Sequence, residues 1–301
     1  MQFHNIYECK SGIVMSSIEE KLLMVQEEKT FKILEGVYHK GQKHAWNGKR
    51  VLQDLISKHG GIKELNPQQK QAIKNIFSII LQGELAAWKI SAQLAAELDN
   101  IEAKMAATSQ VHDEARHFYV MRDYLNHSNL QNVSVKLPQS IETTLEMVTS
   151  TNNMAKKILG MQLMIEPVAL TIFQKVREAN VEPVLSDLLV YFEKDEARHV
   201  ALGVNYLPVI LNEMSATEIL SLLVWQIRLF KLEVVGLREL QEDFKCLGID
   251  PEKAFSLAEK KQLDALKLLS SKIKMGNWIW KPAKIFAENY KRRIFTEDNS
   301  G

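Results

Sequence analysis

Hydrophobic residues recur at helical spacing along most of the chain, and we find no convincing run of alternating β-branched residues that would indicate a strand. The pattern predicts one or two preliminary helices within residues 16–58, broken around residues 39–48. It then predicts longer helices over about 67–98, 101–127, from Pro138 to about 179, 183–211, 215–246 and 251–274. The expected fold class is therefore all-α.

Turn and capping residues place the ends of these helices. Asn66 precedes a helix-starting Pro67, and Asp99-Asn100 suits a reversal between two antiparallel helices. The stretch from Ala179 to Pro183 suits a second reversal, and Ser215 with Glu218 reads as a capping box. An interruption is expected near residues 151–153.

The pentapeptide Asp-Glu-Ala-Arg-His occurs twice, as Asp113–His117 and Asp195–His199. The glutamate of each copy lies 30 positions after another glutamate, Glu84 or Glu166. Within each copy the Glu and His are three residues apart, so both side chains project from one face of a helix. Four Glu and two His in two equivalent halves predict a carboxylate site for two metal ions.

Strongly apolar stretches surround Glu84 and Glu166, namely residues 76–81 and 160–165. A carboxylate buried among them without a partner would be very costly, and metal coordination would remove that cost. The alternative is a solvated helix face with ordinary surface ion pairs. Pro167 follows Glu166 inside a predicted helix, where it removes a backbone donor and should kink or bulge the turn.

Composition describes an ordinary globular chain: 301 residues, 46% hydrophobic, 25% charged, net charge +1. We expect one domain over residues 1–301, with a metal-binding bundle over about 64–212 flanked by helices in 1–63 and 213–301. The charge gives no hint of nucleic acid. Cys9 and Cys246 form no C-x-x-C pair, and we see neither a secretion signal nor a membrane span, so a reducing cytoplasm fits best.

The repeated arrangement between residues 84 and 199 resembles the ferritin-like non-haem di-iron carboxylate superfamily. This superfamily includes multicomponent monooxygenases, acyl desaturases, ribonucleotide reductase small subunits and aldehyde-deformylating oxygenases. The resemblance implies a ferritin-like four-helix bundle with additional N- and C-terminal helices. It also implies two iron ions, or an Fe/Mn or Mn/Mn pair, held by six ligands: Glu84, Glu114, His117, Glu166, Glu196 and His199.

The same resemblance implies that the charged residues beside the ligands orient the ligand side chains. Asp113 and Asp195 would each accept a hydrogen bond from a histidine on the opposing helix, with Arg116 and Arg198 neutralising them. Plain ion pairing along a helix is the alternative. His39, His44 and His112 are further candidate ligands, although surface or core-edge positions suit them better.

The implied activity is an oxidoreductase that uses O₂ as co-substrate and oxidises an apolar small molecule beside the metals. No flavin, nicotinamide or iron–sulfur motif is visible, so electrons would come from a separate donor protein, and a homodimer is expected by analogy. Residues one turn from the ligands are candidates for the substrate cavity, although most could be ordinary core: Trp88, Gln110, Met121, Gln162, Leu170, Phe173 and Phe192. Alternatives are a ferroxidase or iron-handling protein, a manganese catalase-like protein and a non-catalytic metal-bearing binding protein.

Several subfamily markers are missing. Met121 occupies the place of the radical-forming tyrosine of ribonucleotide reductase subunits, while Ala86 and Met161 replace the valine and tyrosine that cross-link in ligand-binding oxidases. Phe192 replaces the third histidine of arylamine N-oxygenases, and Leu170 stands where hydroxylases often carry a threonine, beside Thr171. The sequence alone therefore favours none of these subfamilies.

Overall fold

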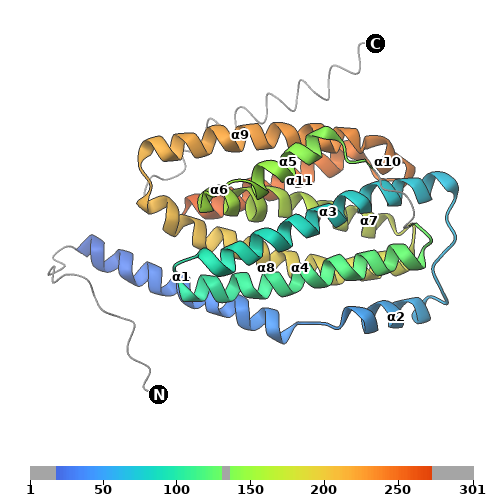
Figure 1. The fold of residues 1–301 in the computed structure, drawn as a ribbon, viewed down its shortest axis with the longest axis horizontal. Helices are drawn as coiled ribbons and strands as arrows, with labels where there is room; N and C mark the ends of the chain where they lie inside the picture. The colour runs from blue at the N-terminus through green and yellow to red at the C-terminus, as the bar shows by residue number, and fades with distance from the viewer. Residues whose placement is uncertain (1–17, 131–135, 273–301) are drawn as a thin grey trace, which may run out of the picture.

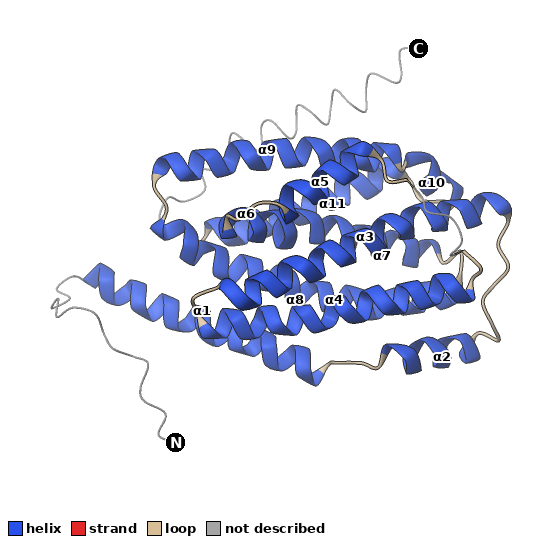
Figure 2. Cartoon of the chain, viewed as in Figure 1, coloured by secondary structure: helices blue, strands red, loops and turns tan. Residues whose placement is uncertain are grey.

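All regular secondary structure in the computed structural model, which describes residues 18–130 and 136–272, is helical (Figure 2). The all-α prediction is confirmed. In chain order the helices are α1 (Ile18–Lys43), α2 (Gly48–Lys58), α3 (Pro67–Glu97), α4 (Ile101–His127), α5 (Gln139–Thr149), α6 (Met154–Ile158), η1 (Leu159–Ile165), α7 (Glu166–Ala179), α8 (Pro183–Glu213), α9 (Ala216–Glu239), α10 (Gln241–Cys246) and α11 (Pro251–Ser270).

Two helical hairpins form the central bundle (Figure 1). In the first, α3 packs along α4; in the second, η1 and α7 pack along α8, and α4 contacts α8 across the middle. Helix α1 packs against α4 and α8 on one side, while α5, α9 and α11 cover the other. This is the expected ferritin-like bundle with additional helices before and after it. Parts of the predicted flanking segments, residues 1–17 and 273–301, lie outside the described residues.

The two predicted capping motifs both lie at helix starts. Asn66 and Gln69 form a capping box at α3, and Ser215 and Glu218 form another at α9. Asn180 adopts the left-handed conformation, with φ of 47°, at the reversal between α7 and α8. The reversal at Asn180 brings α8 back alongside α7.

One predicted helix was wrong in its extent. The segment expected to run from residue 215 to about 246 breaks at Leu240, where α9 ends and α10 begins. No Gly or Pro marks this point. Helix α10 instead packs against α3, and Asn75 donates a hydrogen bond to Asp243 at 3.0 Å, so long-range contacts set the new direction.

Apolar layers lie on both sides of the repeated glutamates. Along α3, α4, the η1–α7 segment and α8, buried residues on one side of the Glu positions join one hydrophobic cluster, and those on the other side join a second. Ile90 and Leu159 belong to the first cluster, while Phe77 and Phe173 belong to the second. The acidic residues therefore form a polar layer across the bundle, with an apolar layer on either side of it along the helix axes.

The bulge expected at Pro167 takes the form of a π-helix. Segment η1 runs up to Glu166, whose backbone N–H reaches back to the carbonyl of Met161. Pro167 then occupies the first turn of α7, where its missing N–H does least harm. The wider turn shifts the register of the helix immediately before Glu166.

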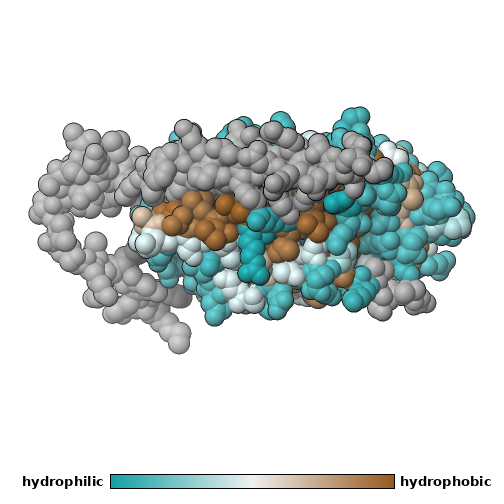
Figure 3. All heavy atoms as spheres, turned by 90° about the horizontal axis from the view of Figure 1, so that it is seen from above, coloured by the Kyte–Doolittle hydropathy of each residue, from teal (hydrophilic) through white to brown (hydrophobic). Residues whose placement is uncertain are grey.

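Exposed apolar side chains occur on α9. Leu220 and Val224 are each 62% exposed and lie one turn apart. Seen from the side of α9, the described surface shows hydrophobic patches next to hydrophilic side chains (Figure 3). No helix among the described residues has the length and apolar character that a membrane crossing requires.

Two glycines in the bundle helices give a matched stability test. A Cβ at Gly203 on α8 would lie 2.7 Å from the Cβ of Gln162, whereas a Cβ at Gly83 on α3 would meet nothing within 4 Å. We expect Gly203→Ala to lower the free energy of unfolding by about 1–3 kcal/mol through overpacking. Gly83→Ala should raise it by about 0.5–1 kcal/mol through helix propensity. Urea denaturation measures both, and equal effects would contradict the packing described for η1 against α8.

Candidate metal centre

The six predicted ligands converge at the middle of the bundle. Helix α3 supplies one glutamate, α7 supplies another, and α4 and α8 each supply a Glu and a His; none of the six is more than 5% exposed. Their donor atoms form two overlapping groups in which all atoms lie within 4.8 Å of one another. The first contains Glu84, Glu114, His117 and Glu196, and the second contains Glu114, Glu166, Glu196 and His199. Glu114 and Glu196, the shared glutamates, belong to both groups, as bridging carboxylates would.

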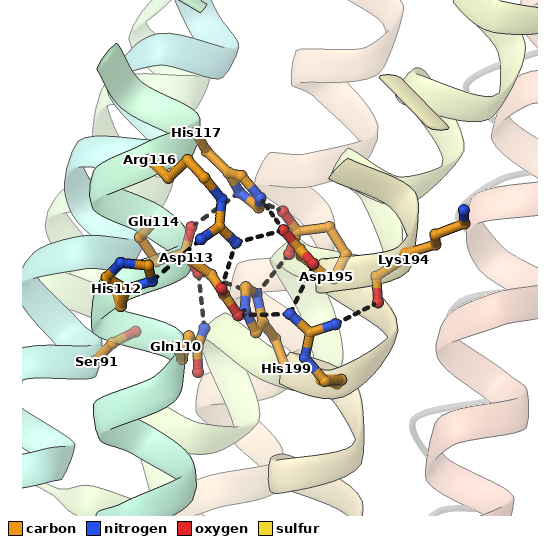
Figure 4. Close-up of polar contacts among 12 residues, drawn as sticks. Ser91, Gln110, His112, Asp113, Glu114, Arg116, His117, Lys194, Asp195 and His199 are labelled. Carbon is orange, nitrogen blue, oxygen red and sulfur yellow. Dashed lines mark hydrogen bonds and ion pairs between the residues drawn. The ribbon is translucent and has the colours of Figure 1, made fainter. Parts of the chain in front are cut away.

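His117 presents its two ring nitrogens to different partners. Nδ1 lies 3.2 Å from Glu84 Oε2 and 3.2 Å from Glu196 Oε1. Nε2 lies 3.1 Å from Oδ2 of Asp195, which belongs to the opposing helix α8 (Figure 4). A ring held by Asp195 in this way keeps Nδ1 available to a metal.

His199 repeats the arrangement from the other half. Its Nδ1 lies 2.7 Å from Glu196 Oε2 and 3.0 Å from Glu114 Oε1. Its Nε2 lies 3.4 Å from Oδ2 of Asp113 on α4 (Figure 4). Each aspartate of the repeated pentapeptide therefore contacts the histidine of the other copy.

Two arginines join the aspartates into one network, referred to below as the Asp/Arg network: Asp113, Arg116, Asp195 and Arg198. The Arg116 guanidinium donates to Asp113 and, at 2.8 Å, to Asp195. Arg198 donates to the same two carboxylates at 2.8 and 2.6 Å. Burial opposes ionisation, but the hydrogen bond from His117 and the charge of Arg198 hold the pKa of Asp195 well below its usual range. Two negative and two positive charges balance within this network.

The ligand groups carry opposite pKa shifts. Burial raises the pKa of Glu84 and Glu166 well above the usual value. Against the effect of burial, the neighbouring histidines lower the pKa of both shared glutamates. The carboxylates in turn raise the pKa of both histidines, although burial opposes this. In the metal-free protein these shifts favour the protonated form of Glu84 and Glu166 and the charged form of both imidazoles, which reduces the net negative charge of the cluster.

The donor set fits two divalent ions. Four carboxylates with two neutral imidazoles carry a charge of −4, which two divalent cations would balance in place of protons. Oε2 of Glu114 is buried and has no hydrogen-bond partner within the described chain, so it is an oxygen available for coordination. Hard carboxylates with one imidazole per metal suit iron or manganese.

Two of the residues predicted for the substrate cavity instead hydrogen-bond beside the ligands. Gln110 donates to Glu114 Oε1 at 2.9 Å and to Glu166 Oε1 at 3.1 Å. Gln162 donates to Gln110 at 3.3 Å. These buried amides orient the carboxylates of α4 and α7.

The other five lie in varied surroundings. Phe192 stacks on His117 with ring centroids 4.2 Å apart, and Phe173 packs edge-on against Phe192. Met121 is fully buried, Leu170 is half-buried, and Trp88 is 36% exposed beside Phe118. One-turn spacing from a ligand selects these residues, but it does not select one side of the metal centre.

A cavity of about 100 Å³ lies between α3 and α7, and α5 and α9 complete its wall. Glu84 and Glu166 line it, so it adjoins the metal centre. None of the seven residues predicted for the substrate cavity lines this cavity. The polar contributors besides those two glutamates are Thr144 and Glu233, and the remaining side chains that line it are apolar: Ile79, Ile80, Ala87, Ile141, Leu145, Met161, Ile165, Val168, Ala169, Ile172, Leu232, Leu237 and Leu240.

Trp46, between α1 and α2, is a site residue that the sequence analysis did not select. Its indole N–H donates to Asp195 Oδ2 at 2.8 Å, and the Arg116 guanidinium carbon lies 4.8 Å from its ring. It packs against the outer face of the Asp/Arg network. A large aromatic residue in an otherwise polar helix break was the only sequence signal.

The three additional histidines do not join either donor group of the described chain. His39 and His44 are exposed, and the ring of His44 bonds the backbone carbonyl of Lys40 at 2.8 Å. His112 lies 3.1 Å from the Arg116 guanidinium. Within the described residues, the candidate ligands therefore number six.

Residues 27–214 match the model of the family described as Methane/Phenol/Alkene Hydroxylase. The comparison with curated proteins gives no match. The family match overturns the expectation that the sequence gives no support to hydroxylases. That expectation rested on Leu170 alone; the neighbouring Thr171 is buried and its hydroxyl donates to the backbone carbonyl of Pro167 at 2.8 Å.

Solved structures with the same fold include two kinds of oxidase. A variant of the R2-like ligand-binding oxidase with an anaerobically reconstituted Mn/Fe cofactor aligns with a TM-score of 0.64 and 17% identity, over 80% of this chain and 93% of that one. A Synechococcus protein with aldehyde deformylating oxidase activity aligns with a TM-score of 0.59 and 14% identity, over 76% and 98%. These similarities confirm the expected ferritin-like bundle fold.

Removing a candidate ligand should remove metal without unfolding the bundle. We expect purified wild-type protein to hold about two iron-type ions per chain, and Glu114→Ala or His199→Ala to fall to one or fewer, because each variant loses a donor. Elemental analysis with circular dichroism measures this. His127→Ala, at an exposed position on α4, is the matched control and should keep both ions. Full metal retention in the ligand variants would contradict their role.

Metal loading should release protons. Burial raises the pKa of Glu84 and Glu166, and the carboxylates raise the pKa of both histidines against the effect of burial, so binding of two Mn²⁺ ions should displace protons from the cluster. Because these protons compete with the metal, affinity should fall as the pH is lowered. Titration calorimetry in buffers with different ionisation enthalpies measures the number released. A heat that is the same in every buffer would contradict the expected proton release.

Proposed function

Because this chain belongs to the methane/phenol/alkene hydroxylase family, we propose that it is an O₂-activating di-iron or Fe/Mn oxidoreductase that acts on an apolar small molecule. The observation that carries this proposal is the position of the cavity. Two overlapping donor groups, which share two glutamates, adjoin an almost wholly apolar space through Glu84 and Glu166. A substrate in this space would lie next to the metals.

The residues of the chain have distinct tasks in this proposal. The six ligands would hold the ions, which when bound supply the electrons and the oxygen chemistry. Asp113 and Asp195 fix the orientation of the histidine rings, and Gln110 fixes two of the carboxylates. The apolar walls exclude water from the space beside Glu84 and Glu166, which limits side reactions there.

The cavity also supports an organic substrate over iron storage or peroxide disproportionation. Its walls offer a hydrated cation little to bind, because most of the lining side chains are aliphatic. Storage of iron would require a route for many such cations. An iron-handling or catalase-like activity, or a purely structural metal, therefore remains the second choice.

Repeated turnover would require electrons from outside the chain. We propose a separate electron-donor protein, since no flavin, nicotinamide or iron–sulfur motif appears in the sequence. A homodimer and a cytoplasmic location also remain predictions.

Oxygen uptake by ferrous protein tests the proposed function. Protein loaded anaerobically with Fe²⁺ should consume about one O₂ per pair of iron ions and then stop until an external reductant is added, because each centre stores only two electrons. An oxygen electrode and rapid-mixing absorbance spectroscopy follow the reaction. Glu114→Ala should consume no O₂ above the rate of free Fe²⁺.

Other outcomes would identify the alternatives. Continued iron uptake with mineral formation would show storage, and O₂ release on addition of peroxide would show catalase activity. A fully loaded protein that is inert toward O₂ in the presence of reductant would overturn the oxidoreductase proposal.

A further inference from the structure

Glu233 on α9 is a buried acid that the metal centre does not use. It lines the cavity, is only 9% exposed, and lies outside both donor groups. Its Oε2 accepts a hydrogen bond from Gln262 Nε2 on α11 at 2.8 Å. Its Oε1 is buried and has no hydrogen-bond partner within the described residues.

No neighbouring side chain in the described structure supplies a hydrogen bond to this oxygen. Gln262 also donates to the backbone carbonyl of Met164 at 2.8 Å, so its amide is committed to η1 as well as to Oε2. Among the described residues that line the cavity, Thr144 is the one uncharged polar side chain, and its hydroxyl donates to the carbonyl of Ser140 at 2.8 Å. A buried polar atom without a partner costs about 1–3 kcal/mol, which makes such an atom a candidate for ligand binding.

The charge state of Glu233 narrows the chemistry of that ligand. Burial raises the pKa of Glu233 to about 8, so the carboxyl is largely protonated at neutral pH. With Oε2 occupied as an acceptor, a protonated carboxyl offers its O–H as an unused donor. The complementary group is a hydrogen-bond acceptor.

The rest of the cavity excludes charged head groups. No Lys, Arg or His is among the residues that line it, so a carboxylate or phosphate bound beside Glu233 would have no positively charged side chain as a partner. An ammonium group carries three N–H donors, and the cavity offers few acceptors for them besides the metal-binding glutamates. A neutral oxygen, with one acceptor position to satisfy, fits what is present.

We propose that Glu233 is a specificity-determining residue that binds the hydroxyl or carbonyl oxygen of an uncharged substrate, with the apolar body of that substrate extending toward Glu84 and Glu166. The inference rests on the proposed function, because it assigns the orientation of the substrate in the same cavity. A head group held at α9 would present a carbon away from that group to the metals. Glu233 would thereby set which position of the substrate is oxidised.

Three probes of nearly equal size test the inference by binding alone. Methylcyclohexane, cyclohexanol and cyclohexylamine share a ring and differ in one apolar, neutral polar or cationic group. Calorimetric titration of the full chain loaded with Mn²⁺ at pH 7 measures their affinities. Glu233→Leu should weaken cyclohexanol binding about tenfold and leave methylcyclohexane unchanged or tighter, because one buried hydrogen bond is worth about that factor. Glu233→Gln, which keeps a donor at the same place, should retain cyclohexanol affinity within about threefold.

A cavity-filling variant ties the binding to this space. Gly83 lines the cavity, and a side chain there would meet no atom at its Cβ, so Gly83→Leu should weaken the binding of both methylcyclohexane and cyclohexanol. Equal effects of Glu233→Leu on the two probes, no cyclohexanol binding to the wild type, or preferred binding of cyclohexylamine would each overturn the inference. Circular dichroism and metal content establish that each variant is folded. Because none of these titrations needs O₂ chemistry, such a result would leave the oxygen-uptake test of the proposed function standing.

Discussion

The stability of the structure depends on neutralising the negative charge of four carboxylates that are buried between two apolar layers. Their mutual repulsion and lost hydration would unfold the bundle unless positive charge is supplied among them. Two histidines and two protons can supply it, and so can two divalent ions. The balanced Asp/Arg network outside the ligands adds no net charge, so it orients the imidazoles without shifting this balance.

Much of the fold and of the candidate site could be predicted because the information is local. Helix periodicity, the caps at Asn66 and Ser215, and the reversal at Asn180 are encoded within a few residues of each feature. The Glu and His of each pentapeptide share a helix face through their spacing alone. Internal repetition then pairs the halves, which is why the six donors could be identified before their contacts were known.

The features that were missed depend on contacts distant in sequence. The break at Leu240 carries no breaker residue and follows from packing of α10 on α3. The cavity wall uses α5 and α9, which the spacing around the ligands does not describe, and Glu233 looks like any acid on an amphipathic helix. Trp46 reaches Asp195 across 149 positions of sequence, and no local pattern indicates such a partner.

The exchange of aspartates between the two repeats has a consequence for how the protein matures. His117 takes its support from the second hairpin through Asp195, and His199 takes its support from the first through Asp113. An isolated hairpin would offer two glutamates and one imidazole that lacks its aspartate partner. These are too few donors for a tight metal site. We therefore expect tight metal binding only after the two hairpins have docked. The bound ions would then stabilise the contact between the two halves of the bundle.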